Sequence, residues 1–427
     1  MKLIRLSVKA FFVLFFATVH AQLDIDADLR SRFEYLHGFN NLFPNDADPA
    51  AFVTQRSRLN IGFKQEKLKI FISVQDVSTW GDTRQILIND GNDSFSLFQA
   101  WGQIFLNSNW SLKAGRQVIS YDDQRIFGGL DWAMQGRFHD AALIKYENET
   151  FKTDIGAAFN QEGQSNEGTL FNIQGFFTYK TMQYGYLKKQ WGKRSASFLF
   201  LNTGFQKFKG INNDEPDGVF YRQTTGSYFT FPVRDINVTG SAYYQFGKSD
   251  ANTDLSAYQI SLEAIYKPGK ILYGLGVEFL SGTDQDGDDK NKSFFPLYGT
   301  NHKFNGYMDY FYVGNHANNV GLNDLYAKVV FTTGKKSSLL FKVHYFMANA
   351  DLIGNADKYL GTEVDLVFKQ QLIKNVKLNI GYSHMFASEN MSLIKGGRPH
   401  DNINNWGWAQ LIINPKLFRA DFKKENE

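Results

Sequence analysis

The chain has 427 residues and no cysteine, so it can bury a substantial core but cannot use disulfide bonds to stabilise it. Its formal net charge is +3, and loss of the first 21 residues, which carry three basic and no acidic side chains, would leave +3 − 3 = 0. This balance excludes a global basic excess that would attract nucleic acid. The aromatic content of 16%, with 40 Phe and 21 Tyr, favours a protein that contacts lipid.

Residues 1–21 predict a secretory signal peptide. Three basic residues precede an apolar stretch over residues 10–19, and Ala21 stands at the expected cleavage position. The stretch is too short for a transmembrane helix, which needs about 20 apolar residues. Later apolar runs such as residues 271–280 are also short and are broken by Gly and Glu. We therefore expect a mature chain from Gln22 that is either exported in soluble form or crosses a membrane as a β-barrel.

The first strand is predicted directly after the signal peptide, over residues 23–35. Its odd positions are apolar except for Ser31, and its even positions are all charged. Successive side chains of a strand point to opposite faces, so one face is apolar and the other carries six charges, which is typical of a wall between lipid and a watery lumen. Similar alternation recurs over residues 151–159, 171–179, 236–246, 258–266, 271–279, 363–368, 376–386 and 406–414.

About eighteen such segments fit the chain, with about 22 residues for each strand and its turn, the spacing expected of an outer-membrane barrel. The predicted fold is thus all-β, a single antiparallel transmembrane barrel over residues 22–418, with a polar tail over residues 419–427. Long polar connections alternate with short ones, as in barrels with long extracellular loops. Because many such barrels end on an aromatic residue, Phe418 or Phe422 would have to serve here.

Four arginines are expected to share one patch of the lumen wall. Arg30 and Arg32 lie on the charged face of the first strand, and Arg56 and Arg58 lie on the polar face of the second. Neighbouring strands are about 5 Å apart, and guanidinium groups match carboxylates in shape and charge. The patch would attract a polyanion. The alternative is a ladder of ion pairs that only stabilises the wall.

A second cluster, over residues 115–140, combines charged side chains with aromatic ones. Its candidate residues are Arg116, Asp122, Asp123, Arg125, Trp132 and Arg137. Charged groups beside flat aromatic faces suit a path for saccharides. The alternative is an ion-pair network around a loop that folds into the barrel.

Metal and catalytic chemistry find little support in the sequence. Asp284, Asp286 and Asp288 resemble a calcium loop, but the glycine is misplaced and no closing Glu follows, so a solvated loop is favoured. There is no nucleophile-elbow sequence, no P-loop and no clear carboxylate pair. We expect no cofactor, no structural metal and no enzymatic activity.

Several motifs resemble the alginate export family of outer-membrane barrels in the form found in Bacteroidota. The matching segments are residues 54–59, 75–82, 99–101, 115–117, 121–125, 132, 136–141 and 298–311. The resemblance spans essentially the whole mature chain. It implies a monomeric eighteen-stranded barrel with a positively charged constriction that passes alginate, a linear polyuronate, and it makes Arg56, Arg58, Arg116, Arg125 and Arg137 candidates for lining the path.

The leading hypothesis is therefore a channel in the outer membrane of a Gram-negative bacterium that passes an anionic polysaccharide or its oligomers. Its partners would be that saccharide, the lipid around the barrel and periplasmic proteins, but not nucleic acid. Direction is open, since a pore can export alginate or admit oligosaccharides. The alternatives are a general diffusion porin with a structural charge ladder, and a saccharide-binding or enzymatic β-protein.

Overall fold

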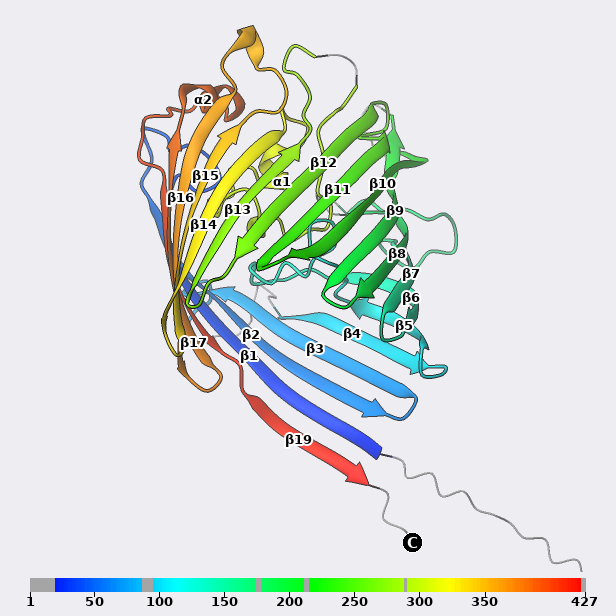
Figure 1. Ribbon diagram of the computed structural model, residues 1–427. Helices are drawn as coiled ribbons and strands as arrows, with labels where there is room; N and C mark the ends of the chain where they lie inside the picture. Colours follow the sequence, from blue (N-terminus) through cyan, green and yellow to red (C-terminus); the bar gives the residue numbers. More distant parts are fainter. Residues whose placement is uncertain are drawn as a thin grey trace, which may run out of the picture.

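The computed structural model describes residues 20–86, 95–173, 175, 178–210, 215–287 and 290–423. Within them the chain forms one closed antiparallel sheet in which consecutive strands from β1 to β18 pair with one another. The first and last strands pair as well, so the sheet closes into a barrel (Figure 1). Residues 1–19, Asp288 and residues 424–427 lie outside the described residues, and with them most of the predicted signal peptide and the end of the predicted tail.

The strands in chain order are β1 (His20–His37), β2 (Ala50–Gln65), β3 (Leu68–Thr79), β4 (Phe95–Phe105), β5 (Trp110–Gln117), β6 (His139–Glu147), β7 (Phe151–Phe159), β8 (Thr181–Trp191), β9 (Arg194–Lys209), β10 (Glu215–Val233), β11 (Ile236–Lys248), β12 (Asp254–Tyr266), β13 (Ile271–Leu280), β14 (Leu322–Gly334), β15 (Ser337–Met347), β16 (Tyr359–Ile373), β17 (Val376–Ala387), β18 (Asn405–Ile413) and β19 (Lys416–Lys423). The helices are short: η1 (Asn301–Lys303), α1 (Val313–His316), η2 (Ile353–Asn355) and α2 (Glu389–Ile394). None of the helices in the described part of the chain is long and apolar enough to span a bilayer.

Strands β18 and β19 are two halves of one barrel strand. Residues 29–37 of β1 pair with β18 and residues 20–26 pair with β19, across an interruption at Asn414 and Pro415. Counted this way the barrel has eighteen strands, which confirms the prediction. The first five residues of the predicted tail belong to β19, which lies beside the start of β1 near the C-terminal end in Figure 1.

The two faces of the wall follow the alternation in the sequence. On β1 the outward side chains of Leu29 and Phe33 are 37% and 45% exposed, whereas Arg30 and Arg32 point inward and are buried. Many large apolar side chains are exposed on the outside of the barrel, whereas many arginine, glutamine and carboxylate side chains are buried. An apolar exterior around a polar interior is the arrangement that a bilayer requires.

The period-two pattern misleads over residues 171–179. The described residues of this stretch lie in the connection between β7 and β8, not in a strand. Phe171 and Tyr179 are buried there, so the alternation reflects packing of a loop rather than a pleated strand.

The connections at the two ends of the barrel differ in length. Turns at one end have two to four residues, as at 66–67, 234–235 and 374–375, and both described ends of the chain lie at this end. The other end carries the long loops, among them residues 118–138 and 281–321. This asymmetry is expected of an outer-membrane barrel, with the short turns on the periplasmic side.

Candidate functional site

Two long loops meet inside the barrel and form a plug, defined here as residues 118–138 and the described residues of 281–321. Phe127 and Tyr298 form a parallel β-bridge, and the N–H of Gly128 donates to the carbonyl of Tyr298 over 2.8 Å. The N–H of Thr300 donates to the carbonyl of Gln124 over 2.9 Å. The buried apolar residues of the plug are Ile119, Ile126, Phe127, Met134, Phe294, Phe295, Leu297, Tyr298, Met308, Tyr310, Phe311 and Val320.

A glycine lets the plug approach the barrel wall on the β16 side. Gly306 has a φ of +87°, and a Cβ added there would lie 2.5 Å from the Oε2 atom of Glu363. The buried Glu363 carboxylate accepts hydrogen bonds from the N–H groups of Tyr307 and Met308, the latter over 3.0 Å. The close approach therefore allows one wall carboxylate to hold two consecutive amides of the plug.

Arginines hold the opposite side of the plug against β1 and β2. Arg30 donates to the carbonyl of Asp131 over 2.7 Å and to its carboxylate over 3.1 Å. Arg56, whose side chain is fully buried, contacts the Asp131 carboxylate over 3.1 Å, the Met134 carbonyl over 3.3 Å and the Asp28 carboxylate over 2.6 Å. Desolvation by the surrounding protein would raise the pKa of Asp131, but the two guanidinium groups outweigh it and lower that pKa. We call these contacts, with those of Arg32 and Arg58 below, the arginine clamp.

The remaining two arginines of the predicted patch are also engaged. Arg32 pairs with Glu34 over 2.8 Å, donates to the Trp132 carbonyl over 2.9 Å and stacks on the Trp132 ring. Arg58 donates to the amide oxygen of Gln75 over 2.6 Å and lies over a phenylalanine ring of β4. The structure thus brings the four arginines together, with Arg30 and Arg56 directly paired across β1 and β2. Their contact with a passing substrate stays a prediction.

The arginines of the second cluster fall into two groups. Arg125 is buried, pairs with Glu278 over 2.7 Å and so binds the plug to β13. Arg137 donates to the carbonyl of Gly299 over 2.8 Å, joining the two plug segments, and burial lowers its pKa to about 10.

The prediction that Arg116 lines the pore is wrong. It pairs with Asp140 over 2.9 Å, and the strand alternation of β5 puts both on the outward face, because the neighbouring Gln117 points inward and is buried. Arg116 is therefore not a lumen residue.

Asp122 and Asp123 anchor the plug rather than line an open path. The Asp122 carboxylate accepts hydrogen bonds from the hydroxyl of Tyr186 over 2.9 Å and from Lys188 over 3.1 Å. Asp123 accepts from the backbone N–H of Arg125 over 3.1 Å, and burial raises its pKa to about 6. Both carboxylates are satisfied by contacts inside the protein.

The acidic loop after β13 is part of a folded connection. A carboxylate oxygen of Asp284 accepts from the N–H of Asp351 over 2.8 Å, and the Asp284 carbonyl accepts from Gly287 over 3.0 Å. Among the described residues no group of three His, Cys, Asp or Glu side chains could hold a metal ion. Asp286 is described, and Asp288 is not, so the calcium hypothesis stays an untested alternative.

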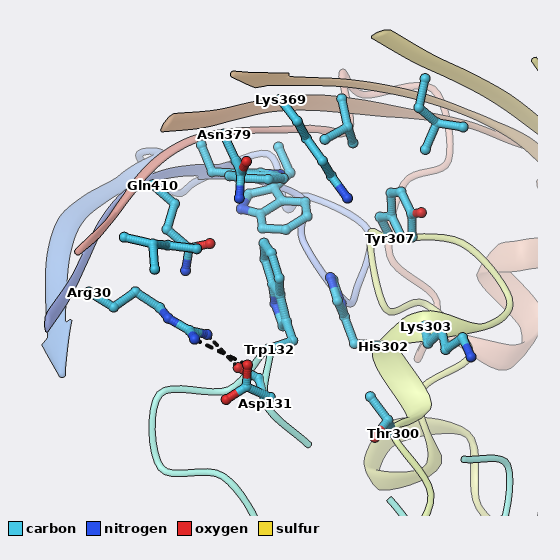
Figure 2. A pocket seen from close by; sticks show the side chains of 15 residues that line it. Arg30, Asp131, Trp132, Thr300, His302, Lys303, Tyr307, Lys369, Asn379 and Gln410 are labelled. Atoms are coloured by element: carbon cyan, nitrogen blue, oxygen red, sulfur yellow. Dashed lines mark hydrogen bonds and ion pairs between the residues drawn. The ribbon is translucent and has the colours of Figure 1, made fainter. Parts of the chain in front are cut away.

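A cavity of about 340 Å³ lies between the plug and the wall formed by β15 to β18 and β1 (Figure 2). The side chains that line it are Arg30, Asp131, Trp132, Thr300, His302, Lys303, Tyr307, Leu340, Val367, Lys369, Asn379, Trp406, Trp408, Gln410 and Ile412. Trp132 stacks on His302 with ring centres 4.4 Å apart. The sequence pattern placed Trp132 in a candidate cluster but missed Lys369 and Gln410. The only sign of them in the sequence was that both lie at inward-facing positions of strands near the end of the chain.

Comparison with known proteins agrees with this architecture. The family described as alginate export matches residues 21–392. No curated protein sequence matches the chain. Solved structures similar to it include OpdL of Pseudomonas aeruginosa, with a TM-score of 0.61, 12% identity and coverage of 93% of this chain and 99% of that one. OccAB4 of Acinetobacter baumannii has a TM-score of 0.60 and 14% identity, covering 94% and 98%. A BenF-like porin of Pseudomonas fluorescens Pf-5 has a TM-score of 0.60 and 13% identity, covering 92% and 99%. At these identities the likeness shows the fold.

Proposed function

The chain belongs to the alginate export family and is an outer-membrane channel of a Gram-negative bacterium, and on that premise we propose that it passes a carboxylated polysaccharide, alginate or its oligomers. The barrel acts as a passive, anion-preferring monomer that performs no catalysis. Gradients and periplasmic partners set the direction of transport. The predicted signal peptide delivers it to the periplasm before insertion.

The observation that carries the proposal is the arginine clamp. Four guanidinium groups gather on one patch of wall, beside the carboxylates of Asp28, Glu34 and Asp131, which leaves an excess of one positive charge (4 − 3). The side chain of Asp131 is 69% exposed, so the lumen reaches the place where a carboxylate meets Arg30 and Arg56. A uronate carboxylate has the same charge and shape as the Asp131 side chain, and guanidinium groups bind both in the same way.

One observation favours a second candidate, a general diffusion porin. Each of the four arginines already has a hydrogen-bond or ion-pair partner within the described residues. A cluster in which every arginine is paired in this way can be purely structural, and small solutes would then pass by size alone.

Single-channel recording in a planar bilayer separates the two functions. The protein is recorded in a salt gradient with and without oligomannuronate, and again with Arg56 and Arg58 changed to Ala. Anion-selective current that oligomannuronate blocks, with weaker block in the double variant, supports the polyuronate channel. Current without preference or block leaves a general porin. Arg116→Ala is the matched control, because this arginine lies on the outward face and its loss should change neither selectivity nor block.

A further inference from the structure

The cavity beside the plug has an unusual wall for a polar lumen. Leu340, Val367 and Ile412 project inward from β15, β16 and β18. Leu340 and Val367 are directly paired across their strands, so they form a continuous apolar surface. The rings of Trp132 and Tyr307 face this surface from the plug (Figure 2). A ligand in this space meets aliphatic and aromatic groups on two sides.

The lining includes one carboxylate, that of Asp131, but the polar atoms of the lining that are buried and without a partner among the described residues are all donors. The indole N–H groups of Trp406 and Trp408 and the amide nitrogen of Gln410 are buried and have no hydrogen-bond partner within the described residues. Lys369 extends its ammonium group into the cavity in Figure 2, and the described residues hold no ion-pair partner for it. Buried donors without partners are rare in folded proteins. All four groups donate hydrogen bonds, so their complement is an acceptor such as a carboxylate.

We propose that this cavity binds a small ring-containing carboxylate with an apolar body, an aryl carboxylate. Its carboxylate oxygens accept from Lys369 and from the unpartnered donors on β18. Its ring packs between the aliphatic wall and the aromatic side chains of the plug, where offset and edge-to-face contacts are favourable. This ligand class differs from the polysaccharide proposed above, so the site adds a second cargo or a regulatory ligand to the channel.

The size and chemistry of the cavity favour an aryl acid over a sugar acid. Benzene fills a cavity of about 150 Å³, so about 340 Å³ accommodates a ring with a short side chain. A hexuronate carries hydroxyl groups around its ring, and each requires a polar partner when buried. Three of the lining side chains, Leu340, Val367 and Ile412, offer none.

Isothermal titration calorimetry on the purified full-length protein in detergent tests the site, with cinnamate as the probe. We expect one binding event per chain, and about tenfold weaker binding in Lys369→Gln, because the charge-assisted hydrogen bond is lost. Lys377→Gln is the matched control. Lys377 lies on β17, paired with Ile412, but does not itself line the cavity. Its loss should therefore leave the affinity for cinnamate unchanged. Cinnamyl alcohol, which has the same ring without the charge, should bind more weakly and be insensitive to Lys369→Gln.

A second variant guards against a general folding effect. Gln410→Leu removes one donor and should also weaken cinnamate binding, while heat-modifiable gel mobility shows that the barrel remains folded. Equal affinities of Lys369→Gln and Lys377→Gln would overturn the proposal. So would tight binding of mannuronate in place of cinnamate, which would assign the cavity to the polysaccharide path. The first result does not bear on oligomannuronate block, and the second would support the proposed function, so this proposal can fail while the proposed function stands.

Discussion

Two sides of the same plug treat their polar groups in opposite ways. At the arginine clamp, on β1 and β2, Arg30, Arg32 and Arg56 each contact a carboxylate and a backbone carbonyl. At the cavity, on β16 to β18, donors such as the Trp408 indole and the Gln410 amide have no partner within the described residues. Both regions face one lumen and both are rich in donors, so residue type alone does not separate them.

The difference indicates what each region does. The clamp leaves only single atoms, such as the Nε of Arg30 and of Arg56, without a partner among the described residues. A charge cluster in which each charged group is paired fixes geometry, because a group that leaves its partner exposes a costly buried charge or dipole. An unsaturated set of buried donors is costly in the free protein and becomes favourable only when a ligand supplies acceptors. The clamp therefore positions the plug and sets the field in the lumen, whereas the cavity is suited to binding a ligand.

The largest expected effect comes from breaking the clamp with Arg56→Ala. This change removes the fully buried Arg56 from the carboxylates of Asp28 and Asp131, which then keep Arg30 alone. We expect the docking of residues 118–138 to weaken by about 3 kcal/mol, the low end for a broken buried pair because Asp131 is largely exposed to the lumen. Hydrogen exchange of the plug amides measures the loss as faster local opening.

Arg116→Ala is the control for that measurement. Its pair with Asp140 is half exposed on the outward face, so the cost should be no more than about 0.5 kcal/mol. Unchanged exchange of the plug in Arg56→Ala would contradict the structural role of the clamp.

The next effect tests the opposite anchor of the plug. Gly306→Ala adds a Cβ at a φ of +87° and within 2.5 Å of the Glu363 carboxylate, so we expect a loss of about 2 kcal/mol in the docking of residues 304–312. Gly354→Ala is matched in backbone geometry, with a φ of +67°, but has open space around the added atom. It should cost about 1 kcal/mol from the backbone alone. Equal losses in thermal unfolding of the two variants would rule out the contact with Glu363 as an anchor.

The sequence allowed the barrel and part of its site to be predicted. Period-two alternation over residues 23–35 placed Arg30 and Arg32 inside, and sequential pairing put Arg56 beside them. The composition of residues 115–140 and the family resemblance put Arg116 on the lumen, but neither determines which face of a strand a side chain takes. A shift of one residue reverses the face, and Gln117 is the inward residue. The strand β19 was missed because Pro415 interrupts the last strand.

Long-range contacts were beyond prediction from one sequence. One partner of Arg30 is Asp131, which is 101 residues away and lies in a loop without regular structure. Lys369 and Gln410 share a cavity only because β16 to β18 close against β1 and the plug fills the space between them. Both features depend on how a loop folds into the lumen, and strand periodicity carries no information about that.

A smaller expected effect depends on pH. Unlike the arginine clamp, whose charges are fixed, a second contact of the plug is made by a lysine that titrates. Lys395, in the loop after β17, is buried and donates to the backbone carbonyl of Tyr310 in the plug. Burial lowers its pKa to about 7. Between pH 7 and 10.5 the docked lysine is neutral and the released lysine is charged, so docking strengthens as pH rises and the full penalty applies below pH 7.

From pH 6 to 7.5 this amounts to under about 1 kcal/mol. Hydrogen exchange of residues 388–404, corrected for intrinsic rates, should show greater protection at pH 7.5. Lys395→Met should abolish the difference. A pH response that persists in this variant would assign the titration to another group.

The smallest expected effect bears on the electrical role of the clamp. Asp131→Asn keeps the shape of the side chain and its acceptor oxygen, so the plug should stay docked, but the excess of positive charge in the clamp rises from one to two. We expect the ratio of anion to cation permeability to rise about twofold, because a charge in the lumen shifts the local concentration of mobile ions and salt screens it over about 10 Å. Reversal potentials in a salt gradient measure the ratio. Asp217→Asn, at a carboxylate near the start of β10 that is about a third exposed and pairs with Lys207, is the matched control and should leave the ratio unchanged. An unchanged ratio in Asp131→Asn would show that the clamp holds the plug without setting selectivity, and the channel would then discriminate anions elsewhere along its path.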